Sequence, residues 1–220
     1  MTIAVGPLLD SVSVTLLDTA RRSWPLMSDL VPYLNEALAA TAAVKPDMYT
    51  RQEFFTPEAG VSQVIPSDGV ALLNVIYNEA SGRVITQVDG GLLDEANRFW
   101  PAATQERDVQ HFAVDPRDPR RFNVTPPSVG PSSGSPASIQ ILYGAVPPTV
   151  TGSSGEDIPI SANFGPILTN YVLAKCYAKN SKKQDITKSQ MYMNAWGATV
   201  GLKTKGQVAV SPRVSVPEGV

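Results

Sequence analysis

The spacing of the apolar residues changes twice along the chain, and these changes constrain its fold more than any other feature of the sequence. Near both ends, apolar residues recur at steps of three or four, which predicts amphipathic helices. From about residue 49 to residue 150 they stand in short β-rich runs separated by turn residues, which predicts strands. The sequence therefore predicts an α+β fold in which helices from both ends of the chain flank a β-rich insertion.

Four helices are expected in the terminal regions, at residues 7–22, about 28–44, about 161–179 and 186–200. The economical arrangement is a four-helix bundle closed by elements that are distant in sequence, from which a small antiparallel β domain projects. In the second helix, Pro32 must either lie within the first turn or kink the helix. The helical stripes consist of Leu9, Val12, Leu16 and Ala20; Leu30, Leu34, Leu38 and Thr41; Ile167, Tyr171, Ala174 and Ala178; and Ile186, Ser189, Met193, Trp196 and Val200.

The middle of the chain is expected to contain short strands and one helix. The strands are residues 49–55, 61–65, 72–77, 84–88, 109–114, 122–125 and 139–143, with the helix at 92–100. Residues 126–136 and 149–156 are rich in small, polar and turn-forming residues, so both are expected to be exposed, flexible connections.

The change of period also predicts the domain boundaries. A discontinuous helical domain is expected from residues 1–48 and 158–202, with a β-rich insertion domain at 49–157 and an extended C-terminal arm at 203–220. The arm is either a frayed end or edge strand of its own domain, or a segment that adds as a strand to a neighbouring subunit. Its candidate contact residues are Val208, Val210, Val214 and Val216.

Composition favours a subunit with large protein contacts over a nucleic-acid-binding domain. Charged residues make up 17% of the chain, below the roughly 25% typical of soluble domains. The formal net charge is −2, so no overall positive field exists to hold DNA phosphates. No apolar run approaches the roughly 18 residues that a membrane helix needs, and the amino terminus lacks the features of a signal peptide. Neither membrane insertion nor secretion is expected.

The sequence offers little material for catalysis or metal binding. His111 is the single histidine and lies in a predicted strand, and Cys176 is the single cysteine. No metal site and no internal disulfide is therefore expected. Both residues are interpreted as structural, with Cys176 as a small buried hydrophobe. No nucleophile elbow of the form G-x-S-x-G is present, and we predict no cofactor and no catalytic residue.

Two acidic segments are better explained by backbone geometry than by catalysis. Asp115 and Asp118 could be paired carboxylates, but a proline follows each of them. This pattern predicts a rigid turn between two strands, in which the carboxylates accept local hydrogen bonds. The sequence Asp89-Gly90-Gly91 lacks a complete phosphate-loop motif and is interpreted as a strand-to-helix joint.

Several short segments form an ordered set over about residues 9–200. They are Leu16-Leu17-Asp18, Arg22-Ser23-Trp24-Pro25, Leu34-Asn35-Glu36, Lys45-Pro46-Asp47, Pro66-Ser67-Asp68-Gly69-Val70, Asp115-Pro116-Arg117-Asp118-Pro119, Asn170-Tyr171-Val172-Leu173, Tyr177-Ala178-Lys179 and Met191-Tyr192. In this order they resemble the head-to-tail adaptors of podoviruses, also called tail tubular protein A-like proteins or head completion adaptors.

The resemblance implies a structural protein of the virion and not an enzyme. It implies a ring, usually of twelve copies, that is assembled in the host cytoplasm and forms part of the DNA channel in the neck of the particle. The helical part would dock under the portal protein, and the β part would face the tail nozzle, a tail tubular protein B-like protein. A lumen without dense lysine and arginine would let the genome slide through without specific binding.

Two alternative functions come from other classes. One is a tail-attached binding module that recognises a ligand or receptor through the β domain. The other is a hydrolase whose site assembles from residues that are distant in sequence. An enclosed pocket with two convergent carboxylates of displaced pKa would favour the hydrolase.

Overall fold

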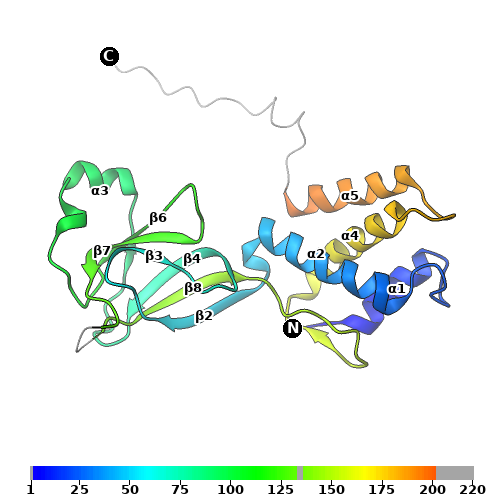
Figure 1. Ribbon diagram of the computed structural model, residues 1–220, viewed down its shortest axis with the longest axis horizontal. Coiled ribbons are helices and arrows are strands. Elements are labelled where there is room, and N and C mark those ends of the chain that lie inside the picture. Colours follow the sequence, from blue (N-terminus) through cyan, green and yellow to red (C-terminus); the bar gives the residue numbers. More distant parts are fainter. Residues whose placement is uncertain (1, 133–135, 202–220) are drawn as a thin grey trace, which may run out of the picture. The chain divides into compact units, whose positions relative to one another are not determined.

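The protein is described by a computed structural model that covers residues 2–132 and 136–201. These residues form two compact units. The first runs from the amino terminus to Leu38 and resumes at Thr149, and the second is Ala39–Pro148. Helices dominate the first unit and strands dominate the second (Figure 1). The predicted α+β class is confirmed. The proposed contact residues of the arm, Val208, Val210, Val214 and Val216, lie outside the described residues.

The helical unit is built around one central helix. Its elements are β1 (Ile3–Ala4), α1 (Val5–Thr15), the π-helix η1 (Leu26–Leu30), the first part of α2 (Val31–Val44), β9 (Asp157–Ile158), the 3-10 turn η4 (Ala162–Phe164), α4 (Gly165–Ala178) and α5 (Ile186–Val200). Buried residues are spread around most of α4, as in a core helix. Helix α1 and η1 contact α4, and α5 lies along it (Figure 1). Of α5 itself, only Trp196 and Val200 are buried.

Helix α1 ends at Thr15 and not at residue 22, as its spacing predicts. The backbone N–H of Leu17 donates to the carbonyl of Val14, and that of Asp18 donates to the carbonyl of Ser13. This is the Schellman pattern that closes many helices. Leu17 occupies the position with positive φ, at 52°, which glycine usually fills. The prediction failed because the sequence has no glycine to mark the end.

The second helix begins with a wider turn. The backbone N–H of Leu30 donates to the carbonyl of Pro25, five residues back, and that of Val31 donates to Leu26. Pro32 has no N–H to donate, and in a regular helix its ring would clash with the carbonyl four residues earlier. The π-turn accommodates this proline at the start of α2. The predicted stripe of this helix is buried and consists of Leu30, Leu34, Leu38 and Thr41.

The second unit contains two sheets around one apolar core. One sheet has the order β2 (Thr50–Phe55), β8 (Ile139–Ala145), β4 (Gly69–Asn78), and the other has the order β3 (Gly60–Val64), β7 (Arg121–Ser128), β6 (His111–Val114), β5 (Thr86–Gln87). All neighbouring strands are antiparallel except β5 and β6. The short elements are η2 (Pro46–Met48), α3 (Gly90–Ala96) and η3 (Trp100–Ala102). Core residues from both sheets include Val75, Phe112, Phe122, Val124, Ile139, Ile141 and Tyr143.

Two segments that were predicted to be flexible connections are structured where they are described. Strand β7 continues through Pro126 and Pro127 to Ser128, which is fully buried. In the other segment, residues 149–156, the carboxylate of Glu156 accepts hydrogen bonds from the backbone N–H groups of residues 151, 152 and 153. A composition rich in serine and glycine does not reveal a carboxylate that organises the turn.

The close packing around Gly144 on the central strand β8 leads to a stability prediction. A Cβ atom at this position would overlap the carbonyl oxygen of Pro46 in η2. Gly144→Ala is therefore expected to lower the free energy of unfolding by about 2 kcal/mol, measured by urea denaturation. The control is Gly6→Ala at an exposed position of α1, where nothing packs within 4 Å of the added Cβ atom and where alanine is expected to be neutral or stabilising by up to about 1 kcal/mol. Equal effects of the two changes would contradict this account.

Candidate functional site

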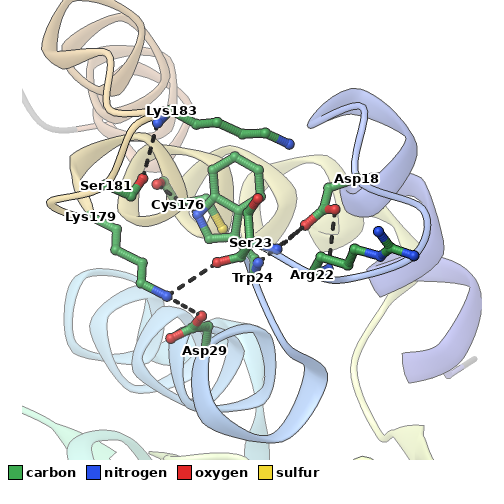
Figure 2. A network of polar contacts seen from close by, with 9 residues as sticks. All are labelled: Asp18, Arg22, Ser23, Trp24, Asp29, Cys176, Lys179, Ser181 and Lys183. Carbon is green, nitrogen blue, oxygen red and sulfur yellow. Dashed lines mark hydrogen bonds and ion pairs between the residues drawn. The ribbon is translucent and has the colours of Figure 1, made fainter.

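The Asp18 loop, residues 16–25, is held by a network of polar contacts in the helical unit (Figure 2). The Asp18 carboxylate accepts three backbone hydrogen bonds, from the N–H groups of Arg22 at 3.2 Å, Ser23 at 2.8 Å and Trp24 at 3.1 Å. These donors have no partner in a helix or strand, since the loop has no regular secondary structure here. One side chain therefore closes the connection between α1 and η1.

Asp18 is charged in this setting even though it is only 8% exposed. Burial acts to raise the pKa of its carboxyl, but the hydrogen bonds from Ser23, Trp24 and Arg22 outweigh burial and hold the pKa below its ordinary value. The charged carboxylate is the form that accepts all three bonds. The loop thus depends on ionised Asp18.

The residues that follow Asp18 tie the loop to α4, which comes some 150 residues later in the chain. The indole N–H of buried Trp24 donates to the carbonyl of Cys176 at 2.9 Å. The Lys179 ammonium donates to the carbonyl of Ser23 at 3.2 Å and to the Asp29 carboxylate at 2.6 Å. Figure 2 shows these contacts converging from the loop, η1 and the end of α4.

Cys176 lies beneath this network and is fully buried. Burial, and to a smaller extent the nearby Asp29 carboxylate, raise the pKa of its thiol to about 12. A thiol with so high a pKa is a poor nucleophile at neutral pH. The prediction that Cys176 is a small buried hydrophobe is confirmed.

A second cluster joins α2, α4 and α5. The Glu36 carboxylate accepts the phenol hydrogen of Tyr171 at 2.9 Å and pairs with the Lys175 ammonium at 2.5 Å. The Tyr171 ring meets Trp196 of α5 edge to face, with centroids 5.2 Å apart. Burial and the bond to Glu36 raise the pKa of Tyr171 to about 12. One tyrosine thus links a polar pair to an aromatic contact.

Three amide side chains form paired hydrogen bonds with the backbone. Each pairs with both the N–H and the C=O of a single residue: Asn35 with Val150, Gln63 with Glu58, and Asn78 with Val109. Asn35 belongs to a motif identified in the sequence, but Gln63 and Asn78 were missed. Gln63 binds a backbone that is only five residues away, but no turn motif in the sequence marks this pair. Asn78 could not have been found locally, because its partner is 31 residues away and only the folded chain brings it near.

The carboxylates of the β unit also organise turns. Asp68 pairs with Arg51 at 2.5 Å and accepts the Tyr143 phenol hydrogen at 3.3 Å. Asp115 and Asp118 accept the backbone N–H groups two residues ahead, at 2.9 and 3.0 Å, which confirms the predicted turn between β6 and β7. The predicted strand-to-helix joint at Asp89-Gly90-Gly91 is confirmed as well. The Asp89 carboxylate accepts the backbone N–H groups of Gly91 and Leu92 and so caps α3.

The segments identified in the sequence therefore coincide with contacts that fix the loops and helices. Those with such contacts include Asp18, Trp24, Asn35, Glu36, Asp68, Tyr171 and Lys179. Comparison with protein families matches residues 3–216 to the family described as SU10 adaptor protein. The chain belongs to the SU10 adaptor protein family. A search of curated proteins found no match.

This family match confirms the resemblance to phage head-to-tail adaptors. The adaptor is a structural protein of the phage virion. Within residues 2–132 and 136–201, no three or more histidine, cysteine, aspartate or glutamate side chains are grouped to hold a metal ion. None of the helices described in the adaptor is long and apolar enough to cross a membrane.

The candidate functional surface of the adaptor is where the Asp18 loop meets solvent. Leu17 is 88% exposed although its neighbours Leu16 and Asp18 are buried. A positive φ costs a residue with a side chain on the order of 1–2 kcal/mol relative to glycine. The adaptor therefore holds an apolar side chain in water at a backbone position that favours glycine. The sequence analysis noted Leu17 only as part of a motif.

The Asp18 loop leads to a stability prediction. Asp18→Asn removes the charge that three backbone N–H groups bind, so the free energy of unfolding at pH 7 is expected to fall by about 2 kcal/mol. Because folding holds the pKa below its ordinary value of 3.8, this contribution is present above about pH 4 and is lost as the pH falls through the folded-state pKa. Urea denaturation between pH 3 and pH 7 measures both effects.

The matched control for Asp18→Asn is Asp10→Asn. Asp10 lies on α1 and pairs with Arg21, but its side chain is 72% exposed, so its loss is expected to cost well under 1 kcal/mol. A difference between the wild-type adaptor and Asp18→Asn that stays constant down to pH 3 would refute the proposed role of the charge.

The raised pKa of the Cys176 thiol predicts that it reacts slowly in the folded adaptor. A thiol with a pKa of about 12 is ionised roughly 10³-fold less at pH 8 than an ordinary thiol. The folded adaptor is expected to react with Ellman's reagent at least that much more slowly than the adaptor unfolded in urea, followed by absorbance. Similar rates in the two states would show that α4 is not packed as described.

Proposed function

We propose that this adaptor is one subunit of a ring that joins the portal protein to the tail nozzle and forms part of the DNA channel. The observation that carries the proposal is the match to an adaptor family over residues 3–216, nearly the whole chain. In this proposal the ring has twelve copies, occupies the neck of the virion and is assembled in the host cytoplasm.

In this proposal the two units bind different partners. The helices of the first unit act as a four-helix bundle that docks under the portal, and the β-rich insertion domain faces the tail nozzle protein. Support for a rigid docking element comes from the Asp18 and Glu36 contacts, which tie the amino-terminal helices to α4 and α5. A rigid element loses little conformational freedom on binding.

Charge and sequence support two further parts of the proposal. The net charge of −2 suits a channel through which DNA moves without being held, because phosphate binding needs clusters of lysine and arginine. The arm at residues 203–220, through Val208, Val210, Val214 and Val216, contributes a strand-like contact to a neighbouring subunit or to the portal.

Electron microscopy of the adaptor with the portal ring of the same phage tests the proposal. A collar of repeated density on one end of the portal is expected, and its symmetry gives the copy number. Bare portals beside unbound adaptor at micromolar concentration would overturn the proposal. In that case, binding of the monomer to a glycan or receptor through the β unit would favour the tail-attached binding module.

A further inference from the structure

Leu17 combines two features that fold stability alone does not explain. It has a left-handed backbone conformation, with φ of 52°, and its side chain is 88% exposed. Val14, three residues earlier on α1, is 59% exposed. Together these two residues, here called the Leu17 knob, present an apolar surface at the end of α1.

The fold does not require the Leu17 side chain. The Schellman bonds that close α1 use backbone atoms of Leu17 and Asp18, and the rest of the loop is held by the Asp18 carboxylate and by Trp24. Glycine would fit this backbone better and would remove the exposed apolar surface. The fold of this unit therefore gives no reason for an apolar side chain at this position.

A suitable recess is present in the same helical unit. A groove of about 590 Å³ lies between the amino-terminal segment and the start of α4. None of the residues that line it is charged; among them are Ile3, Pro7, Leu8, Pro166 and Thr169.

Other recesses are less suitable for an apolar side chain. One of about 380 Å³ is lined in part by Asp10 and Arg21, and one of about 460 Å³ in part by Asp89, Asp115 and Arg117. An apolar side chain that enters such a recess desolvates charged groups without pairing them.

We propose that the Leu17 knob of one adaptor enters the uncharged groove of a second copy. The groove cannot be filled by the Leu17 of its own chain, because that side chain is almost fully in solvent. A contact between two different patches of identical subunits is heterologous, and heterologous contacts generate a ring when the rotation between subunits closes. This inference rests on the proposed ring and names a contact that holds it together.

The decisive variant is Leu17→Gly, because it separates folding from assembly. It relieves the backbone strain, so the monomer is expected to unfold at a higher urea concentration than wild type. It also removes the knob, so the concentration at which the adaptor assembles, alone or on the portal, is expected to rise at least about tenfold. Urea denaturation and mass photometry measure the two effects.

The control for the loss of exposed apolar surface is Val84→Ala. Val84 is 76% exposed but lies in the β unit, away from the Asp18 loop in the sequence, so its replacement is expected to leave assembly unchanged. Leu17→Gly that assembles like wild type, or that is less stable than wild type as a monomer, would overturn the inference. Rings that form normally but no longer bind the portal would assign the knob to the portal and also overturn it.

A cysteine pair tests the location of the contact. Leu17→Cys and Thr169→Cys, made in separate chains and mixed, are expected to form an intermolecular disulfide on oxidation of the assembled adaptor. Thr169→Cys mixed with Val84→Cys, an exposed position in the β unit, serves as the control. Equal yields of the two pairs would contradict the groove as the receptor. If the wild-type adaptor neither self-associates nor binds portal, the proposed ring itself fails, which is a separate outcome.

Discussion

The contact between the Asp18 loop and α4 is the interaction on which the helical unit depends. Its partners come from opposite ends of the chain, with a complete β unit between them. Bringing the two ends together has an entropic cost that specific contacts must offset. The Trp24 indole and the Lys179 ammonium supply such contacts, and the Asp18 carboxylate holds the loop in the conformation that presents Trp24.

The same device recurs in both units. Short polar side chains, rather than long regular elements, fix the connections: Asp18 and Glu156 each bind several backbone N–H groups of a loop, and Asn78 pairs with Val109 as a strand would. A chain with many short elements leaves many backbone groups without partners in helices or sheets. Carboxylates in the loops and amides on helices and strands satisfy some of these groups.

The fixing of loops by polar side chains matters for how an adaptor binds other proteins. A subunit that joins other proteins needs loops that are rigid enough to present contact residues without losing entropy on binding. In the Asp18 loop, the buried carboxylate and the exposed Leu17 are adjacent in sequence, so the residue that fixes the loop also fixes the direction of the apolar side chain. In the proposed ring contact, stability and recognition are therefore coupled through adjacent residues.

The sequence by itself determined the kinds of element and much of the core. The helical stripe from Leu30 to Thr41, the buried Cys176 and the turn at Asp115 follow from local spacing and turn chemistry. The end of α1 and the turn before Pro32 are also local, but no residue type in the sequence marks them. Only the tertiary structure decided which residues Asn78 and Trp24 bind. Spacing is a local property that any stretch of chain carries, whereas a side chain that binds a distant backbone group acquires its partner only when the chain is folded.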